Sequence, residues 1–368
     1  MATTPATAAV PARRPMMQRA RSATLVRHLG IALIAGLVLY VVSNGLSAFD
    51  NLQLATMAYY FTAVAGLTVL TGVNGQVSLG HGAFMAVGAY TTAKLLGDGT
   101  DHLPLALVLL LAAVISGVAG VIAGAAAARL RGPYLAGATL ALAVGLPSIA
   151  DRFPGFLGAS NGLTVIPSTP PASLGATFPL ERWQAWITCL GALVVYVLLA
   201  NLMRSRFGRA FRAVRDDEIA AELAGLHVAR TQVLAFVVSA ACAGLGGGLF
   251  VVVTQLAAPG AFQLSLSVAL LAGVVLGGLG SLWGAALGAA ALVLIPQWSD
   301  SLSKSLSLSD NVQANLALAV YGLLLIGVIL LAPRGLAGAF DRAGGLIRSF
   351  WVHNRTRRAT PRRGEEQA

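Results

Sequence analysis

Charged residues are scarce in this sequence. Only 11% of its 368 residues are Asp, Glu, Lys or Arg, whereas 57% are hydrophobic and the mean hydropathy is +0.77. Soluble domains typically carry about 25% charged residues, so this composition excludes a soluble globular protein. It predicts an all-α polytopic membrane protein, because apolar stretches of about 20 residues cross a bilayer as helices.

Lysine is almost absent, with Lys94 and Lys304 as its only examples, and no G-x-x-x-x-G-K-[ST] motif occurs. The chain therefore lacks a Walker A phosphate cradle, is not predicted to be an enzyme, and needs another subunit to hydrolyse any ATP that drives it. No Asp, Glu or Lys lies inside a predicted span. This absence argues against a proton-coupled secondary transporter, although sodium coupling through carbonyl and hydroxyl oxygens stays an alternative.

Cysteine is also rare. Cys189 and Cys242 each lie within an apolar stretch and are interpreted as small core residues, without a disulfide framework or a metal site. The net charge of +11 would ordinarily suggest a nucleic-acid partner. Here the Arg residues lie in short segments between apolar stretches, so the predicted partner is the lipid bilayer and not nucleic acid.

Uncharged intervals predict about ten spans. Residues 1–28 predict a disordered basic N-terminus, residues 29–333 a transmembrane domain, and residues 334–368 a basic tail. The intervals are Leu29–Phe49 with one span, Asn51–Ala93 with two, His102–Ala128, Gly132–Ala150 and Trp183–Met203 with one each, Thr231–Ser299 with three, and Asn311–Pro333 with one. Eight or nine spans result if a segment is re-entrant, because counting does not detect broken helices.

Ten spans place both termini on the same side of the membrane. Of the 25 Lys and Arg residues, only Lys94, Arg152, Arg182 and Lys304 then lie on the other side. This asymmetry identifies the side of the termini as the cytoplasm. The Pro-punctuated segment 151–182 is then external, either as a plain connecting loop or as a surface for a partner.

The loop over 204–232 is the only densely charged stretch between apolar segments. Its Arg and acidic residues would each cost roughly 2.5–3.5 kcal/mol in hydrocarbon, so the loop must lie in water. Ile219, Leu223 and Leu226 recur at helical spacing, and Gly225 can end such a helix in the left-handed conformation. The pattern predicts a short docking helix, and a solvated loop that only sets topology is the alternative.

A second unusual stretch, Asn74–Gly82, interrupts an apolar interval with glycines and polar side chains. Irregular backbone at membrane depth is tolerated only where it is buried in protein or lines a cavity, so the stretch is a candidate pathway segment with a broken helix. The alternative is a cytoplasmic turn followed by a closely packed face of small residues, Gly82, Ala86, Ala89 and Ala93. The candidate pathway residues are Asn74, Gly75, Gln76, Ser78, Gly80, His81 and Gly82.

Both stretches resemble known motifs. Ile219–Gly225 is similar to the E-A-A-x-x-x-G loop of bacterial ABC-importer permeases, although Ile219 stands where Glu is usual and Glu218 precedes it. Gly75–Tyr90 resembles the G-x-x-S-L-G-H-x-A-F-x-x-x-G-A-Y signature of branched-chain amino acid permease subunits. Further matches to that family follow in order at Arg212–Leu226, Leu234–Gly246, Gly277–Ala285 and Pro333–Gly338. The chain is identified as a member of this family, closer to the LivM type than to LivH.

The resemblance implies a permease of type II ABC importer architecture in the bacterial cytoplasmic (inner) membrane. It implies as partners a homologous permease subunit, two ATP-binding subunits that use ATP and Mg²⁺, and a solute-binding protein that meets the external segment. The implied substrates are Leu, Ile and Val, and relatives with similar signatures carry urea, short amides or other small solutes.

The family's loop forms a coupling helix seated in a cleft of the ATPase, and small residues such as Ala220 and Ala221 would allow close seating. The implied coupling residues are Arg215, Asp216, Asp217, Glu218, Ile219, Ala220, Ala221, Glu222 and Gly225.

Overall fold

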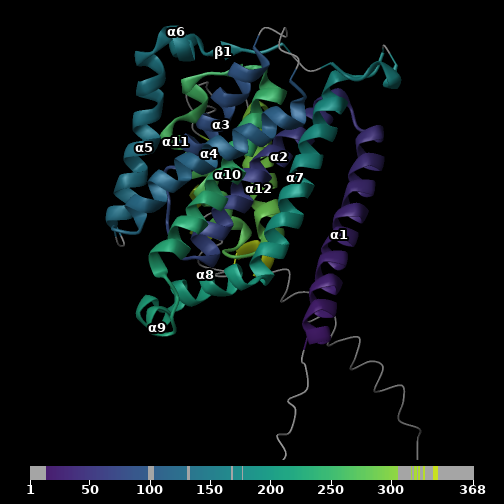
Figure 1. The fold of residues 1–368 in the computed structure, drawn as a ribbon. Helices are drawn as coiled ribbons and strands as arrows, with labels where there is room; N and C mark the ends of the chain where they lie inside the picture. The colour runs from purple at the N-terminus through teal and green to yellow at the C-terminus, as the bar shows by residue number, and fades with distance from the viewer. Residues whose placement is uncertain are drawn as a thin grey trace, which may run out of the picture.

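The computed structural model describes residues 14–305, except 98–102, 131–132, 167–168 and 176, together with a few residues between 316 and 338. Helices dominate the described part, as predicted (Figure 1). They are α1 (Arg14–Gly45), α2 (Ala48–Leu67), α3 (His81–Leu96), α4 (Leu105–Ala127), α5 (Pro133–Arg152), α6 (Pro154–Leu157), α7 (Leu180–Arg204), α8 (Arg206–Asp216), α9 (Glu218–Leu223), α10 (Val228–Thr254), α11 (Leu264–Gly277) and α12 (Leu282–Ser305). The shorter elements are the π-helical turn η1 (Thr68–Val73), the 3-10 turns η2 (Ala159–Asn161), η3 (Ala172–Leu174) and η4 (Pro259–Phe262), and the strands β1 (Leu163–Thr164) and β2 (Leu256–Ala257).

Eight helices of the described part are long and apolar enough to cross a membrane. They account for eight of the ten predicted spans, including all three in Thr231–Ser299. The second half of Asn51–Ala93 instead forms α3, a helix of only 16 residues. The interval Asn311–Pro333 lies almost entirely outside the described residues.

The first helix is longer than predicted. α1 begins at Arg14, so the prediction of disorder over residues 1–28 is wrong for 14–28, while 1–13 lie outside the described residues. The physical reason is local. Beyond Pro15, which a first helical turn tolerates, residues 16–28 contain neither Gly nor Pro and include good helix formers such as Met, Gln, Ala and Arg.

Helix α10 lies in the middle of the bundle and packs against α4, α3 and α2 (Figure 1). Its core side chains include Phe236 and Leu249, which are fully buried. Small residues let the neighbours come close. A Cβ on Gly88 of α3 would lie 2.0 Å from the carbonyl oxygen of Gly244 in α10. Backbone contact of this kind is the usual way in which membrane helices associate.

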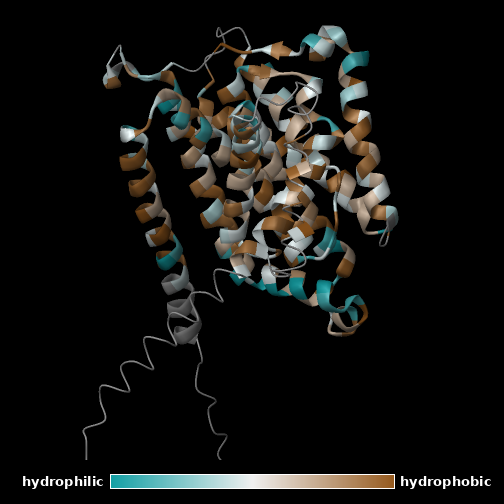
Figure 2. Ribbon diagram, turned by 180° about the vertical axis from the view of Figure 1, so that it is seen from behind, coloured by the Kyte–Doolittle hydropathy of each residue, from teal (hydrophilic) through white to brown (hydrophobic). Residues whose placement is uncertain are grey.

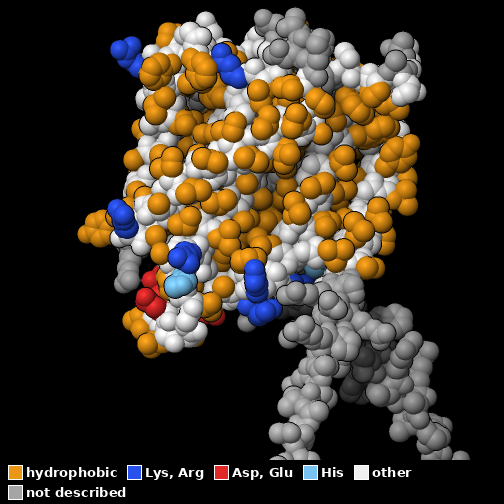
Figure 3. All heavy atoms as spheres, viewed as in Figure 1, with side chains coloured by type: hydrophobic (Ala, Val, Ile, Leu, Met, Phe, Trp, Pro, Cys, Tyr) orange, Lys and Arg blue, Asp and Glu red, His pale blue; other side chains and the backbone are white. Residues whose placement is uncertain are grey.

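The outer faces of the bundle are apolar, as a lipid-facing surface requires. Helix α1 stands at the edge against α7, and its Leu33, Ile34 and Leu37 are exposed. Figure 2 shows hydrophobic residues along the outer helices, with hydrophilic ones gathered near the ends. Figure 3 shows the same band, with Lys and Arg side chains toward the two ends of the molecule.

The two ends of the bundle carry different structures (Figure 1). At one end lie α6 and β1, and at the other α8 and α9. Strand β1 pairs antiparallel with β2, and the amide of Val165 donates to the carbonyl oxygen of Gln255 at 2.9 Å. These bonds fasten the segment 151–182 onto the connection between α10 and α11.

Candidate functional site

The charged loop folds into two short helices joined at Asp217. Ser205 caps α8, because its Oγ accepts a hydrogen bond from the amide of Phe207 at 3.1 Å. Phe211 and Val214 of α8 are buried, whereas Arg206, Arg209 and Arg215 on the same helix are exposed. This one-sided burial fixes α8 along the end of the bundle.

Helix α9 is defined by caps at both ends. The Oδ1 of Asp217 accepts hydrogen bonds from the amides of Ile219 at 2.9 Å and Ala220 at 3.0 Å. At the other end Gly225 adopts a φ of +84°, and the amide of Leu226 donates to the carbonyl oxygen of Ala221 at 3.0 Å. This is the Schellman pattern, which glycine favours because it has no Cβ. The sequence placed this short helix and its end correctly.

The faces of α9 differ from the expectation in one respect. Ala221 is only 4% exposed, because it packs into the permease itself, so it is not available to seat in a partner. The outward face instead presents Ile219, which is 71% exposed, and Leu223, which is 86% exposed, with Ala220 and Glu222 also exposed. A hydrogen bond of 2.9 Å from Nε2 of Gln232 to Oε1 of Glu218 ties α9 to α10.

The Asn74–Gly82 stretch contains a true break between helices. The chain leaves α2 through η1, has no helix over residues 74–80, and resumes as α3 at His81. Nε2 of His81 donates to the carbonyl oxygen of Ala63 at 3.0 Å. Ala63 lies ten residues before the end of η1, or about 15 Å along the helix at 1.5 Å per residue. The N-terminus of α3 is therefore well inside the bundle, level with the interior of α2.

A second short helix begins beside it. Helix α11 has 14 residues, and Oγ of its Ser267 accepts a hydrogen bond from the amide of Gly82 at 2.9 Å. The amide of Leu79 donates to Oγ1 of Thr139 in α5 at 3.0 Å. Two short helices thus bring their N-terminal turns together inside the bundle. Sequence reasoning missed both Ser267 and Thr139, because neither has a recognisable motif.

The predicted pathway side chains are enclosed in this structure. Asn74, Gln76, Ser78 and His81 are all buried. Among the described residues, the side-chain atoms Oδ1 and Nδ2 of Asn74 have no hydrogen-bond partner, and neither does Nδ1 of His81. The small-residue face of α3 that formed the alternative interpretation, Gly82, Ala86, Ala89 and Ala93, is buried as well. Close packing and a broken helix therefore occur together.

The two candidate regions meet at Arg215. Its Nη1 donates to the carbonyl oxygen of Gly72 at 3.0 Å, and its side chain lies against Gly75. The charged loop and the broken helix are consequently one continuous site, with the loop at the end of the bundle and the break reaching inward from it.

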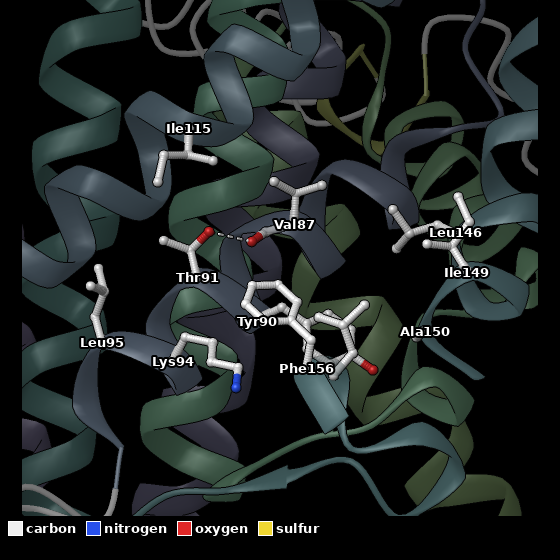
Figure 4. A pocket seen from close by; sticks show the side chains of 11 residues that line it. Val87, Tyr90, Thr91, Lys94, Leu95, Ile115, Leu146, Ile149, Ala150 and Phe156 are labelled. Carbon is white, nitrogen blue, oxygen red and sulfur yellow. Dashed lines mark hydrogen bonds between the residues drawn. The ribbon is translucent and has the colours of Figure 1, made fainter. Parts of the chain in front are cut away.

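A separate cavity of about 430 Å³ lies between α3, α4, α5 and α6 (Figure 4). Its wall is mostly aliphatic, and Nζ of Lys94 lies 4.8 Å from the ring centroid of Phe156. None of the Asn74–Gly82 residues lines it. It is a lateral space next to the α6 end of the bundle, and its lining in α3 begins at Val87, five residues after the Asn74–Gly82 stretch.

An all-helical bundle with discontinuous helices whose ends meet in its interior is the architecture of a polytopic membrane transport protein. A family model described as branched-chain amino acid transport system, permease component, matches residues 48–329. The chain belongs to this family, which confirms the resemblance inferred from the motifs and the assignment to a transport permease.

Individual relatives agree. The chain is 33% identical over 286 residues to the high-affinity branched-chain amino acid transport system permease protein LivM of Salmonella typhimurium, covering 71% of this chain and 66% of that protein. It is 32% identical to LivM of Escherichia coli over the same shares. It is 27% identical over 302 residues to LivH of Salmonella typhimurium, covering 76% of this chain and 91% of LivH. The chain thus spans slightly less than two thirds of the LivM proteins. No solved structure matches it.

Proposed function

We propose that this protein is a permease subunit of an ABC importer that moves branched-chain amino acids, Leu, Ile and Val, across the bacterial cytoplasmic membrane. The observation that carries the proposal is the family match over residues 48–329 together with the LivM relatives. An importer of this kind works with a homologous permease subunit, two ATP-binding subunits that use ATP and Mg²⁺, and a solute-binding protein.

Helix α9 is proposed as the element that docks into the ATPase. It projects beyond α8 at one end of the bundle, and its caps give it a defined shape (Figure 1). Two exposed aliphatic side chains, Ile219 and Leu223, offer apolar area at an aqueous surface, where it stays uncovered in this chain alone. Exposed apolar area of this kind is typical of a surface that another protein covers.

The proposed orientation places α8 and α9 in the cytoplasm, with both termini on that side. Lys94 and Arg182, two of the four basic residues predicted to be external, support it. Lys94 contacts Phe156 of α6, and Nη2 of Arg182 donates to the carbonyl oxygen of Asn44 at 3.4 Å, near the start of α7. Both contacts lie at the end opposite to α8 and α9, which fits the positive-inside rule.

The Asn74–Gly82 stretch is proposed as part of the moving pathway. Its buried polar atoms without partners among the described residues are costly to stability, by about 1–3 kcal/mol each. A segment that exchanges partners during a transport cycle accounts for such atoms better than a static core does.

The test is to purify the four-subunit complex and measure ATP hydrolysis with and without its solute-binding protein. The binding protein loaded with leucine should stimulate hydrolysis. Urea and short amides should neither bind to that protein nor stimulate hydrolysis. If only urea or an amide stimulates hydrolysis, the protein is still an importer permease, but its substrate is not a branched-chain amino acid. A chain that retains no ATPase subunit on purification would contradict the importer itself.

A further inference from the structure

Arg215 occupies the junction between the ATPase-facing loop and the broken helix. It is the penultimate residue of α8, and its guanidinium has two partners in different elements. Nη1 donates to the carbonyl oxygen of Gly72 at 3.0 Å, while Nε and Nη2 donate to Oδ1 of Asp216 at 3.0 Å and 2.7 Å. The side chain is 40% exposed, so it bridges the surface and the bundle.

The carbonyl oxygen that Arg215 binds belongs to the last turn of a helix. In η1 the amides of Asn74 and Gln76 donate to the carbonyl oxygens of Val69 and Leu70 at 3.0 Å and 3.1 Å. Carbonyl groups at a helix C-terminus carry partial negative charge and attract cations. A guanidinium bound to Gly72 therefore makes a charge-assisted hydrogen bond, which is stronger than a neutral one.

The backbone around this hydrogen bond is closely packed against its neighbours. A Cβ on Gly75, whose φ is +79°, would lie 2.6 Å from Cγ of Arg215. A Cβ on Gly72 would lie 2.2 Å from the amide nitrogen of Gly280, in the turn between α11 and α12. The end of η1 is thus clamped between Arg215 on one side and the Gly280 turn on the other.

The residues that join Arg215 to α9 also have defined partners. Asp216 follows Arg215 directly, Asp217 caps α9, and Glu218 is bonded to Gln232 of α10. Because three consecutive residues hold defined partners, a displacement of α9 moves the Arg215 guanidinium. From Gly72, only the short segment 74–80 separates the clamp from the N-terminus of α3 and its bond to Ser267.

We infer that Arg215 is the positioning residue that transmits movement of the ATPase-bound α9 to the broken helix, through its hydrogen bond to the carbonyl oxygen of Gly72. The inference rests on the proposed function, because it assigns a path to the energy that the ATPase subunits supply. Arg215 contacts both elements, and chains of packed and hydrogen-bonded side chains of this kind carry energetic coupling between distant sites.

The first test measures, in the absence of partner subunits, how strongly Arg215 stabilises the end of η1. Hydrogen exchange of the Asn74 and Gln76 amides is compared in the purified permease and its Arg215→Gln variant, with Arg209→Gln as the matched control. Arg209 is exposed on the same helix, and its guanidinium has no hydrogen-bond partner among the described residues. Exchange should rise about 10-fold in Arg215→Gln, as expected for loss of a charge-assisted bond, and stay unchanged in Arg209→Gln. Amides of α10 report whether the variant is folded.

The second test measures coupling in the full complex, as leucine uptake per ATP hydrolysed in proteoliposomes. Arg215→Gln should lower this ratio by about 10-fold. The ratio for Arg215→Lys should lie between those of Arg215→Gln and the unmodified complex, because Lys keeps the charge but lacks the planar guanidinium that reaches two partners. The Arg209→Gln ratio should equal that of the unmodified complex. Equal ratios for all variants, or unchanged exchange at Asn74 and Gln76, would overturn the inference. If the unmodified complex shows no ATP-dependent uptake, the proposed function fails, while hydrogen exchange still decides what Arg215 holds.

Discussion

Single glycines determine how closely the core helices approach one another. Gly88 and Gly244 put the backbones of α3 and α10 in direct contact, whereas Gly145 in α5 has no atom within 4 Å of where its Cβ would be. In the sequence, Gly88 and Gly145 are both glycines within apolar helices, and nothing there distinguishes them. Only the structure separates a glycine that packing requires from one that it does not.

This contrast gives a matched prediction for stability. Gly88→Ala should destabilise the permease by about 1–3 kcal/mol, because the added methyl group overpacks the core. Gly145→Ala should leave stability unchanged or raise it by up to about 1 kcal/mol, because alanine restricts the unfolded chain. Thermal unfolding of both variants in detergent, followed by circular dichroism, measures the difference. Similar melting temperatures for the two would show that α3 and α10 are not in close contact.

Residue types predicted which side chains are buried better than they predicted which face of a helix turns toward the partner. The small face of α3 was recognisable from its spacing, and all four of its residues are buried. Ala221 was also small and suitably spaced, yet it faces the permease. Periodicity shows which residues share a face of a six-residue helix, but the connections at Asp217 and Gly225 decide which face turns outward.

At the scale of elements, α9 presents its aliphatic side chains to water. Leu223→Glu should weaken retention of the ATPase by about 10- to 100-fold, because burying a leucine contributes about 1.5–3 kcal/mol. Ala229→Glu is the matched control, since it adds the same charge at an exposed position in the first turn of α10. Co-purification of the ATPase at graded concentrations measures the loss. If both variants retain it equally, α9 is not the docking element.

Helix breaks were only partly predictable. Glycines and polar residues marked the break before α3, and the end of α9 was evident because Gly225 accepts the left-handed conformation, whereas the cap at Asp217 was seen only in the structure. The connection from Gln255 to Gln263 before α11 lies in a long uncharged interval, where counting spans does not show that a helix is short. The longer α1 was missed because a basic, Pro-containing terminus resembles a disordered one.

At the scale of the whole molecule, the charge asymmetry and the two ends of the bundle make one prediction. A cysteine at Ser173, in the segment 151–182, should react with an impermeant maleimide added to intact cells. A cysteine at Ala224, next to α9, should react only after the membrane is opened. Both positions are exposed, and the native Cys189 and Cys242 are buried, so their background labelling should be low. The reverse pattern would invert the orientation.

This protein is proposed to move amino acids with energy from ATP that other subunits hydrolyse. The most direct test of this proposal is uptake of radiolabelled leucine into proteoliposomes that contain the four-subunit complex, with the solute-binding protein outside and ATP inside. Uptake should require both ATP and the binding protein and should be unaffected by collapse of proton or sodium gradients. Uptake that proceeds without ATP and disappears when a gradient is collapsed would contradict the proposal and identify a secondary transporter.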